Sequence, residues 1–188
     1  MSYTQELGKR AKAAEAFISS ASTMQKNKAL AAISKALIEN SSLIIAENAK
    51  DIAAAKENGM SEAKQDRLML DASRIEGIAK GVDQIIALGD PIGEIIGGGN
   101  RPNGLQIIKT RVPLGVIGII FESRPNVTVD AAALCLKTGN VVILKGGKEA
   151  INSNICLGKI MREAVESAGL PADIIQVVEN TDRETTNE

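Results

Sequence analysis

Apolar and polar residues follow two different periods along this chain, one typical of helices and one typical of strands. From Thr4 to Leu88 the apolar positions recur every three or four residues, within a composition rich in Ala, Lys, Glu, Leu and Ile. The clearest faces are Leu30, Ile33, Leu37 and Ile38, followed by Ile75, Ile78, Val82, Ile85 and Ile86. This half of the chain is predicted to be a layer of amphipathic helices whose apolar faces build a core.

Polar caps divide the helical half into segments. A hydroxyl at position 2 or 4 can cap a first helix, one at 22 or 23 a second, and Asp71 the last. Asn58-Gly59 and Gly89 are typical helix ends. The predicted helices cover residues 4–19, 23–40, 41–58, 61–70 and 72–89.

Residues 90–112 predict a β-hairpin arm. IGEII and LQIIKTR are β-prone runs, and GGGNRPNG between them favours a turn. The glycines at 97–99 do not indicate a phosphate loop, because no Lys-Ser/Thr pair follows them and no helix begins there. An arm outside the main sheet leaves unpaired edges that a second subunit commonly covers, so the segment predicts a homo-oligomer.

Residues 113–188 predict parallel strands joined by helices. The runs 116–121 and 141–144 are rich in β-branched residues, so both are predicted to be strands buried on two faces. The helix between them is expected over 126–138, capped by Gly139, and a second helix over 151–169 leads to a third strand at 174–178. The apolar face of the first of these helices is predicted at Val127, Ala131, Leu134, Cys135 and Thr138.

The end of the chain suggests part of a larger domain. Residues 181–184, Thr-Asp-Arg-Glu, form a capping box that predicts another helix, yet no apolar residue follows before Glu188. The last strand would then have an uncovered edge, so we expect a half-domain cut off at the start of its next helix.

Composition excludes several classes of function. The net charge is −1 with basic residues spread along the chain, so no nucleic-acid or anionic-membrane surface is indicated. The chain has no His and only two Cys, far apart in apolar patterns, which argues against a metal site or a disulfide framework and fits a reducing cytoplasm. No signal peptide or membrane-spanning run is recognisable, so a cytoplasmic protein is expected.

Polar residues gather where the first two predicted strands end. Ser123-Arg124-Pro125-Asn126 offers a hydroxyl, a cation and an amide near a helix N-terminus, which suits an anion but equally suits a plain helix cap by Ser123 or Asn126. Residues 145–149, KGGKE, offer two lysines and two glycines, either as a phosphate site or as a solvated turn. Because parallel strands end at one rim of a sheet, the two loops are expected to lie side by side.

The remaining candidate nucleophiles and bases are weak. Cys135 and Cys156 fall mid-helix on the apolar side, where burial raises the pKa of a thiol and makes it inert. Both are predicted to be core residues. Glu122 stands at a strand tip and could be a general base, but nothing near it in sequence would raise its pKa.

The stretch VPLGVIGIIFESRPNVTVDAAALCLKTGNVVILKGGKEAINSN, with the preceding IGEII…NRPNGL, closely resembles the γ-glutamyl phosphate reductases of the aldehyde dehydrogenase superfamily. The resemblance covers effectively the whole chain, and ESRPN and KGGKEA are its most specific motifs. It implies an aldehyde dehydrogenase-like α/β fold. Its expected parts are an N-terminal helical segment over 1–89, an oligomerisation-type hairpin arm over 90–112, and the first half of a Rossmann-like NADP-binding sheet over 113–188, incomplete at its C-terminus.

The resemblance also implies an activity and site roles. The activity is NADPH-dependent reduction of the small-molecule substrate L-glutamyl 5-phosphate to L-glutamate 5-semialdehyde, with release of phosphate, in proline biosynthesis. Asn126 matches the family's oxyanion donor, and Lys145, Gly146 and Gly147 match its cofactor loop. Many relatives carry a Glu where this chain has Lys148, and an ammonium there suits the 2′-phosphate of NADP. Ser123 and Arg124 are expected to bind substrate.

The family mechanism needs a Cys nucleophile, which neither Cys135 nor Cys156 matches. That Cys is expected C-terminal to these residues, so the 188 residues alone are predicted to be inactive. Two alternatives stay open. One is another aldehyde dehydrogenase that releases a free acid, which Lys148 and the SRPN motif disfavour. The other is a non-catalytic module that binds nucleotide or assembles through its hairpin.

Overall fold

The helical half folds as the caps predict. The structure, a computed structural model, describes residues 2–181. Ser2 and Ser22 each form a capping box with the Gln three residues later, and the Asp71 carboxylate accepts from the Arg74 amide at 2.8 Å. The helices are α1 (Tyr3–Ser19), α2 (Thr23–Glu39), α3 (Ser41–Glu57), α4 (Glu62–Leu68) and α5 (Ala72–Ala87).

The second half forms a parallel sheet with two crossover helices. Strands β3 (Val116–Ile120), β4 (Val141–Lys145) and β5 (Ile175–Val177) lie in the order β3-β4-β5. Helix α6 (Pro125–Lys137) joins the first pair, and α7 (Ile151–Ser167) the second. Gly139 ends α6 at φ +71°, in the left-handed region that glycine adopts without strain, as predicted. Short 3-10 turns, η1 (Lys148–Ala150) and η2 (Ala172–Ile174), precede α7 and β5.

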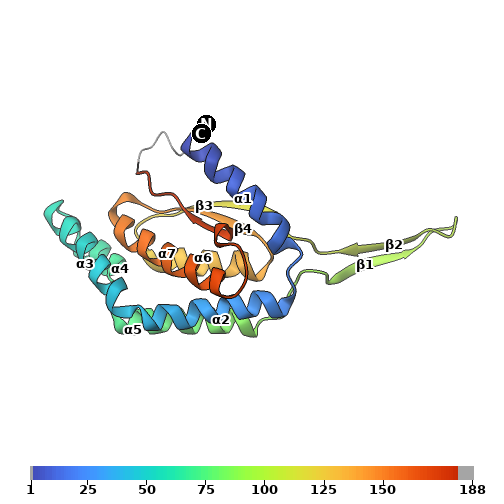
Figure 1. The fold of residues 1–188 in the computed structure, drawn as a ribbon, viewed down its shortest axis with the longest axis horizontal. Coiled ribbons are helices and arrows are strands. Elements are labelled where there is room, and N and C mark those ends of the chain that lie inside the picture. The colour runs from blue at the N-terminus through green and yellow to red at the C-terminus, as the bar shows by residue number, and fades with distance from the viewer. Residues whose placement is uncertain (1, 182–188) are drawn as a thin grey trace.

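Helices cover both faces of this sheet. Figure 1 shows α1 on one side of the strands, α6 and α7 on the other, and α2 with α5 as a further layer below α6 and α7. One continuous apolar cluster includes buried residues of α1, α2, α5, α6, α7, β4 and β5, and the half-buried Ile117 and Ile119 of β3 pack against it. The N-terminal helices therefore share their core with the sheet, because their apolar faces pack onto α6 and α7.

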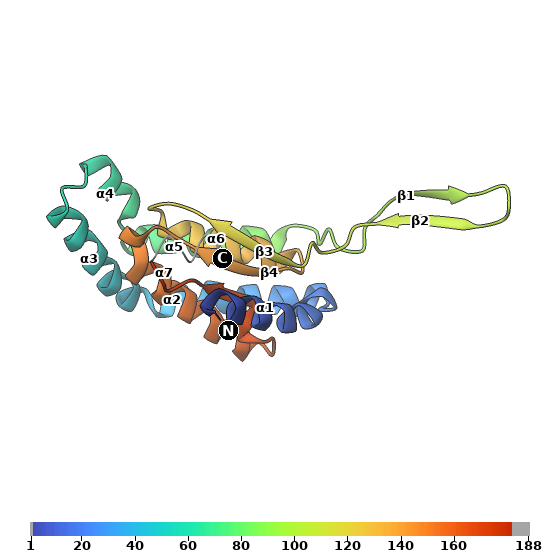
Figure 2. The same cartoon turned by 90° about the horizontal axis from the view of Figure 1, so that it is seen from above.

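The hairpin projects from this body. Strands β1 (Ile95–Asn100) and β2 (Gln106–Thr110) pair antiparallel, and every residue of both is exposed. Figure 2 shows the two strands extending well away from the helices and the sheet. The predicted arm is confirmed, but the glycines at 97–99 lie within β1 and not in the predicted turn, which falls at 101–105. Its exposed apolar side chains include Ile95, Ile96, Leu105, Ile107 and Ile108.

Two burial predictions were wrong. Strand β3 was expected to be buried on both faces, yet Val116 and Ile120 are exposed, because β3 is an edge strand with weaker helix cover than β4. The apolar face of α6 was also misplaced. Its buried side carries Thr128, Val129, Ala132 and Leu136, whereas Leu134 is 50% exposed. Helix α6 is apolar nearly all round, so its period does not define one inner face.

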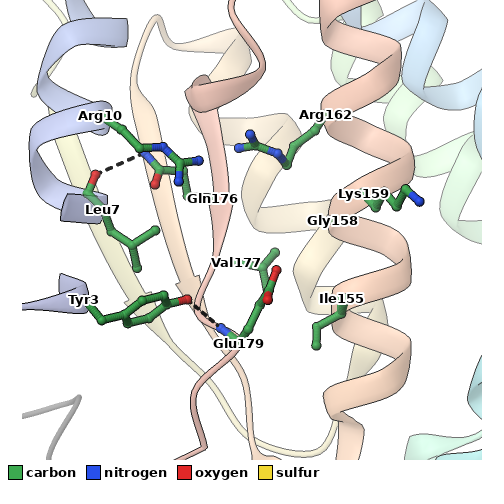
Figure 3. Close-up of a pocket in the computed structure, with 10 residues that line it drawn as sticks. All are labelled: Tyr3, Leu7, Arg10, Ile155, Gly158, Lys159, Arg162, Gln176, Val177 and Glu179. Carbon is green, nitrogen blue, oxygen red and sulfur yellow. Dashed lines mark hydrogen bonds between the residues drawn. The ribbon is translucent and has the colours of Figure 1, made fainter.

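Two ion pairs to Asp173 connect α1 and α7 to the β5 edge of the sheet. Figure 3 shows Arg10 of α1 and Arg162 of α7 on either side of β5. Both guanidinium groups bind the Asp173 carboxylate, at 2.6 and 2.9 Å. The hydrogen bond from Arg10, aided by the one from Arg162, lowers the pKa of Asp173 against the effect of burial. These arginines therefore have a structural partner, and both line a hollow of about 320 Å³ between α1 and α7.

No single helix among residues 2–181 is long and apolar enough to cross a membrane. Helices α2 and α3 meet those criteria only as a pair bent by 70°. The capping box predicted at 181–184 falls largely outside the described residues.

Candidate functional site

The two polar loops lie at the same rim of the sheet. Strands β3 and β4 are parallel, with Ile120 opposite Lys145, and the Phe121 amide donates to the Lys145 carbonyl at 3.0 Å. Beyond the strands, the Ser123 hydroxyl donates to the Glu149 carboxylate, which ties one loop to the other. The predicted juxtaposition of the two strand ends is therefore confirmed.

Asn126 stands in the first turn of α6. The cap position is Arg124, no side chain caps the helix, and Pro125 is the first helical residue, so the predicted capping by Ser123 or Asn126 was wrong. Instead the Asn126 amide donates to Asp130 Oδ2 at 3.0 Å, one helical turn away. An amide nitrogen carries two hydrogens, so this bond orients Asn126 and leaves a second N–H for another acceptor.

A hollow of about 300 Å³ opens beside Asn126. Its wall comes from α4, α5 and the first turns of α6. Burial raises the pKa of the Asp130 carboxyl, against the smaller, opposite effect of the Asn126 hydrogen bond. The lining residues are Arg67, Met69, Leu70, Arg74, Gly77, Ile78, Asn126 and Asp130.

Ser123 and Arg124 line a second hollow, of about 460 Å³. Helix α4 contributes Lys64 and Arg67 to it, so three cationic side chains surround the loop after β3. Arg67 lines both hollows. Glu122 and Glu149 are the acidic residues in this wall, and Glu149 is held by Ser123. The hollow can therefore hold an anion, and it shares Arg67 with the hollow beside Asn126.

Sequence reasoning missed the contribution of α4. The N-terminal helices were interpreted as packing elements, and nothing in the local pattern of EAKQDRL indicates a ligand. The available signal was weak: α4 buries only Leu68, so a short, charged helix with almost no apolar face had little packing role. Asp130 was missed for a related reason, since a single acidic residue inside a helix is usually solvated.

Lys145 ends β4 beside an apolar hollow of about 150 Å³. Its ammonium donates to the Asn180 carbonyl at 3.4 Å. Lys148, in η1, is exposed. Residues of β3 and β4 form an apolar wall of this hollow, and the Lys145 side chain also lines it. Its walls are Thr4, Leu7, Gly118, Ile119, Ile120, Ile143, Lys145 and Val178.

Gly146 and Gly147, between Lys145 and Lys148, lie where there is no room for a side chain. A Cβ on Gly146 would collide with the Asn154 amide, and one on Gly147 would collide with the Glu149 carboxylate. The N-terminus of α7 is already occupied by Asp51, which accepts from the Ser153 amide at 2.8 Å. A phosphate therefore has no helix terminus to bind here, and any cofactor contact by the glycine backbone stays a prediction.

Both cysteines are buried and reduced, as predicted. Burial raises the pKa of Cys135 to about 11, and it also raises that of Cys156. A buried thiol whose pKa is raised above its ordinary value carries little thiolate at neutral pH, so neither cysteine is suited to act as a nucleophile.

This fold and this rim define a class of protein. The sequence model of the aldehyde dehydrogenase family matches residues 4–188, and the chain belongs to that family. The resemblance to one branch is also confirmed: the chain is 54% identical over 181 residues to the γ-glutamyl phosphate reductase of Clostridium botulinum (strain Eklund 17B). That match covers 96% of this chain and 44% of the relative, so the chain spans less than half the length of the curated relatives it matches.

Solved structures agree. The γ-glutamyl phosphate reductase of Thermotoga maritima superimposes with a TM-score of 0.95 at 40% identity, over 97% of this chain and 44% of that one. The enzyme of the same name from Saccharomyces cerevisiae gives 0.91 at 31% identity, over 98% of this chain and 48% of its own. The expected aldehyde dehydrogenase-like α/β fold is therefore confirmed.

Proposed function

We propose that the protein carrying this chain reduces L-glutamyl 5-phosphate with NADPH, releasing phosphate and L-glutamate 5-semialdehyde. The observation that carries the proposal is the 54% identity to a γ-glutamyl phosphate reductase over nearly the whole chain. The geometry supports it, because an amide donor and a cationic hollow adjoin each other at the rim where parallel sheets bind ligands.

Each site residue then has a role in acyl transfer. The second N–H of Asn126 donates to the carbonyl oxygen, whose negative charge grows as a nucleophile adds. Ser123, Arg124 and Lys64 surround the phosphate as it leaves with its extra charge. The nucleophile is a Cys outside these 188 residues, since Cys135 and Cys156 are buried thiols.

The cofactor site is the Lys145 rim. NADPH, when bound, supplies a hydride. The apolar hollow between β3, β4 and α1 suits a flat adenine ring, and Lys145 at its edge suits the ribose hydroxyls. Lys148 is exposed and without an ion pair within residues 2–181, which suits a 2′-phosphate. With Gly146 and Gly147 between them, these residues are the proposed cofactor loop.

Replacing Lys148 with glutamate is expected to reverse the cofactor preference. The carboxylate repels a 2′-phosphate and accepts from a 2′-hydroxyl, so kcat/KM for NADPH should fall about 10- to 100-fold while that for NADH rises. Steady-state kinetics of the full-length protein with both cofactors measure this. Lys159→Glu, the same charge reversal at an exposed position of α7, should leave the ratio unchanged. An unchanged ratio in Lys148→Glu would remove Lys148 from the site.

We also propose that the chain is organised in the three parts predicted from sequence, and that the protein is a cytoplasmic homo-oligomer. The hairpin arm carries the exposed isoleucines of β1 and β2, and two unpaired strand edges. An exposed apolar ribbon of this kind favours association with another copy of the chain.

The assay that tests the proposed function runs the reaction backwards. The full-length protein is mixed with L-glutamate 5-semialdehyde, NADP and inorganic phosphate, and NADPH formation is followed at 340 nm. We expect turnover that requires phosphate, and none from the 188 residues alone. Turnover without phosphate would instead indicate an aldehyde dehydrogenase that releases a free acid, and no turnover would indicate a binding or assembly module.

A further inference from the structure

The hollow beside Asn126 holds one carboxylate and one guanidinium that lack charged partners. Asp130 bonds to a neutral amide, that of Asn126, and Arg67 has no ion pair among residues 2–181. Arg74, the other cation of the wall, is committed: it binds Asp66 Oδ1 at 2.6 Å and the Met69 carbonyl at 3.0 Å. Opposite charges that are left available in one hollow complement a zwitterion.

Helix α5 keeps this hollow open. Gly77 lies mid-helix, where glycine is unfavourable, and a Cβ there would point into open space within the wall. Ile78 and Leu70 supply apolar surface alongside. Asp130 is half-buried, and burial raises its pKa, as expected of a carboxylate that lacks a cation beside it. The wall of the hollow therefore carries a carboxylate, a guanidinium group and apolar side chains.

We propose that this hollow binds the α-amino acid end of the substrate, with Asp130 holding the α-ammonium and Arg67 the α-carboxylate. The assignment rests on the proposed function, because it takes the substrate to be a glutamyl compound. Asn126 and Asp130 lie one helical turn apart on the same face of α6. Two methylene groups separate the α-carbon of a glutamyl group from its reacting carbonyl, so one molecule can bind both residues. The phosphate then points to the hollow of Ser123 and Arg124.

The proposal makes Asp130 a specificity residue, and a pair of substrates tests that. In the full-length protein, with NADP and saturating phosphate, L-glutamate 5-semialdehyde is compared with 5-oxopentanoate, which lacks only the α-amino group. We expect Asp130→Asn to reduce the preference for the amino substrate about 10- to 100-fold. The activity with 5-oxopentanoate should change far less. Asp83→Asn, the same substitution at an exposed position of α5, should leave the preference intact.

A purely structural role predicts a different result. If Asp130 only orients Asn126 or supports the fold, both substrates lose activity by the same factor and the preference is kept, which overturns the proposal. Wild-type protein that turns over neither substrate would refute the proposed function, and binding then tests this site separately.

Calorimetry provides that independent readout. L-glutamate and glutarate are titrated onto the full-length protein as non-reacting probes that differ only in the α-ammonium. Asp130→Asn is expected to weaken L-glutamate alone, whereas Arg67→Gln weakens both, because both probes carry the carboxylate. Equal affinity of wild-type protein for the two probes, or an Asp130→Asn variant that keeps the wild-type preference, contradicts the assignment.

Discussion

Replacing Asp90 with alanine is expected to lower the free energy of unfolding by about 3–5 kcal/mol. The Asp90 carboxylate binds the Lys26 ammonium at 2.6 Å, and the Lys26 side chain is only 2% exposed. The Thr23 hydroxyl donates to the same carboxylate at 2.6 Å. The buried ammonium of Lys137 lies near enough to feel both charges: besides burial, which lowers the pKa of Lys137, Asp90 raises it and Lys26 lowers it. Without Asp90, Lys26 keeps its buried charge and has no counterion, which explains the size of the effect.

Acid pH should remove the same stabilisation. Burial tends to raise the pKa of Asp90, but hydrogen bonds from Lys26, Thr23 and Ile92 outweigh it, and the folded pKa lies below the ordinary value. The contribution of Asp90 is therefore complete above about pH 4 and lost as the pH falls through the folded pKa. Urea unfolding followed by circular dichroism should show the stability difference between wild type and Asp90→Ala growing as the pH rises to about 5 and then staying constant up to about pH 7.

A double variant provides the control for Asp90. Lys26→Met removes the orphaned charge, so Lys26→Met with Asp90→Ala should be more stable than Asp90→Ala alone. A loss below about 1 kcal/mol in Asp90→Ala, typical of a surface ion pair, would show that Lys26 reaches solvent when its partner is absent.

Replacing Asp51 with alanine should cost about 3–4 kcal/mol. Asp51 is 2% exposed, and its two oxygens accept from the backbone amides and side chains of Asn152 and Ser153 at 2.6–3.1 Å. It thus caps α7 from α3, across a large sequence separation. Its removal leaves buried N–H groups at the start of α7 without acceptors, and the loop that carries Lys148 loses its anchor.

An exposed cap is the matched control for Asp51. Asp71 caps its own helix at 2.8 Å from the Arg74 amide but is exposed, so Asp71→Ala should cost only about 1 kcal/mol. The same denaturation series measures both variants. Equal losses for Asp51→Ala and Asp71→Ala would mean that water replaces Asp51 at α7 and that α3 does not position the Lys148 loop.

Local chemistry fixed much of the fold in advance. Capping serines, Gly139 and the turn glycines define where elements begin and end, since these signals act within a few residues. The predictions that were wrong concern burial, which depends on tertiary neighbours. The edge position of β3 and the inner side of α6 are set by which elements pack on them, and Leu134 is as apolar as Leu136 in sequence although only Leu136 is buried.

The site residues also divide into those that the sequence predicted and those that depend on tertiary packing. The loops of Asn126 and Lys145 were placed correctly because the βαβ rule brings strand ends to one rim. Arg67 could not be assigned, since it lines the hollow beside Asn126 only through the packing of α4 against elements distant in sequence. The sequence also did not show that the Asn126 side chain bonds to Asp130 and does not cap the helix.

We expect Asn126 to stabilise the oxyanion of an acyl phosphate beside the proposed cofactor loop. The most direct measurement is kcat for Asn126→Ala in the full-length protein, with NADP, phosphate and L-glutamate 5-semialdehyde. We expect kcat to fall about 10²- to 10³-fold with the KM for NADP nearly unchanged. A kcat within a few-fold of wild type would contradict it.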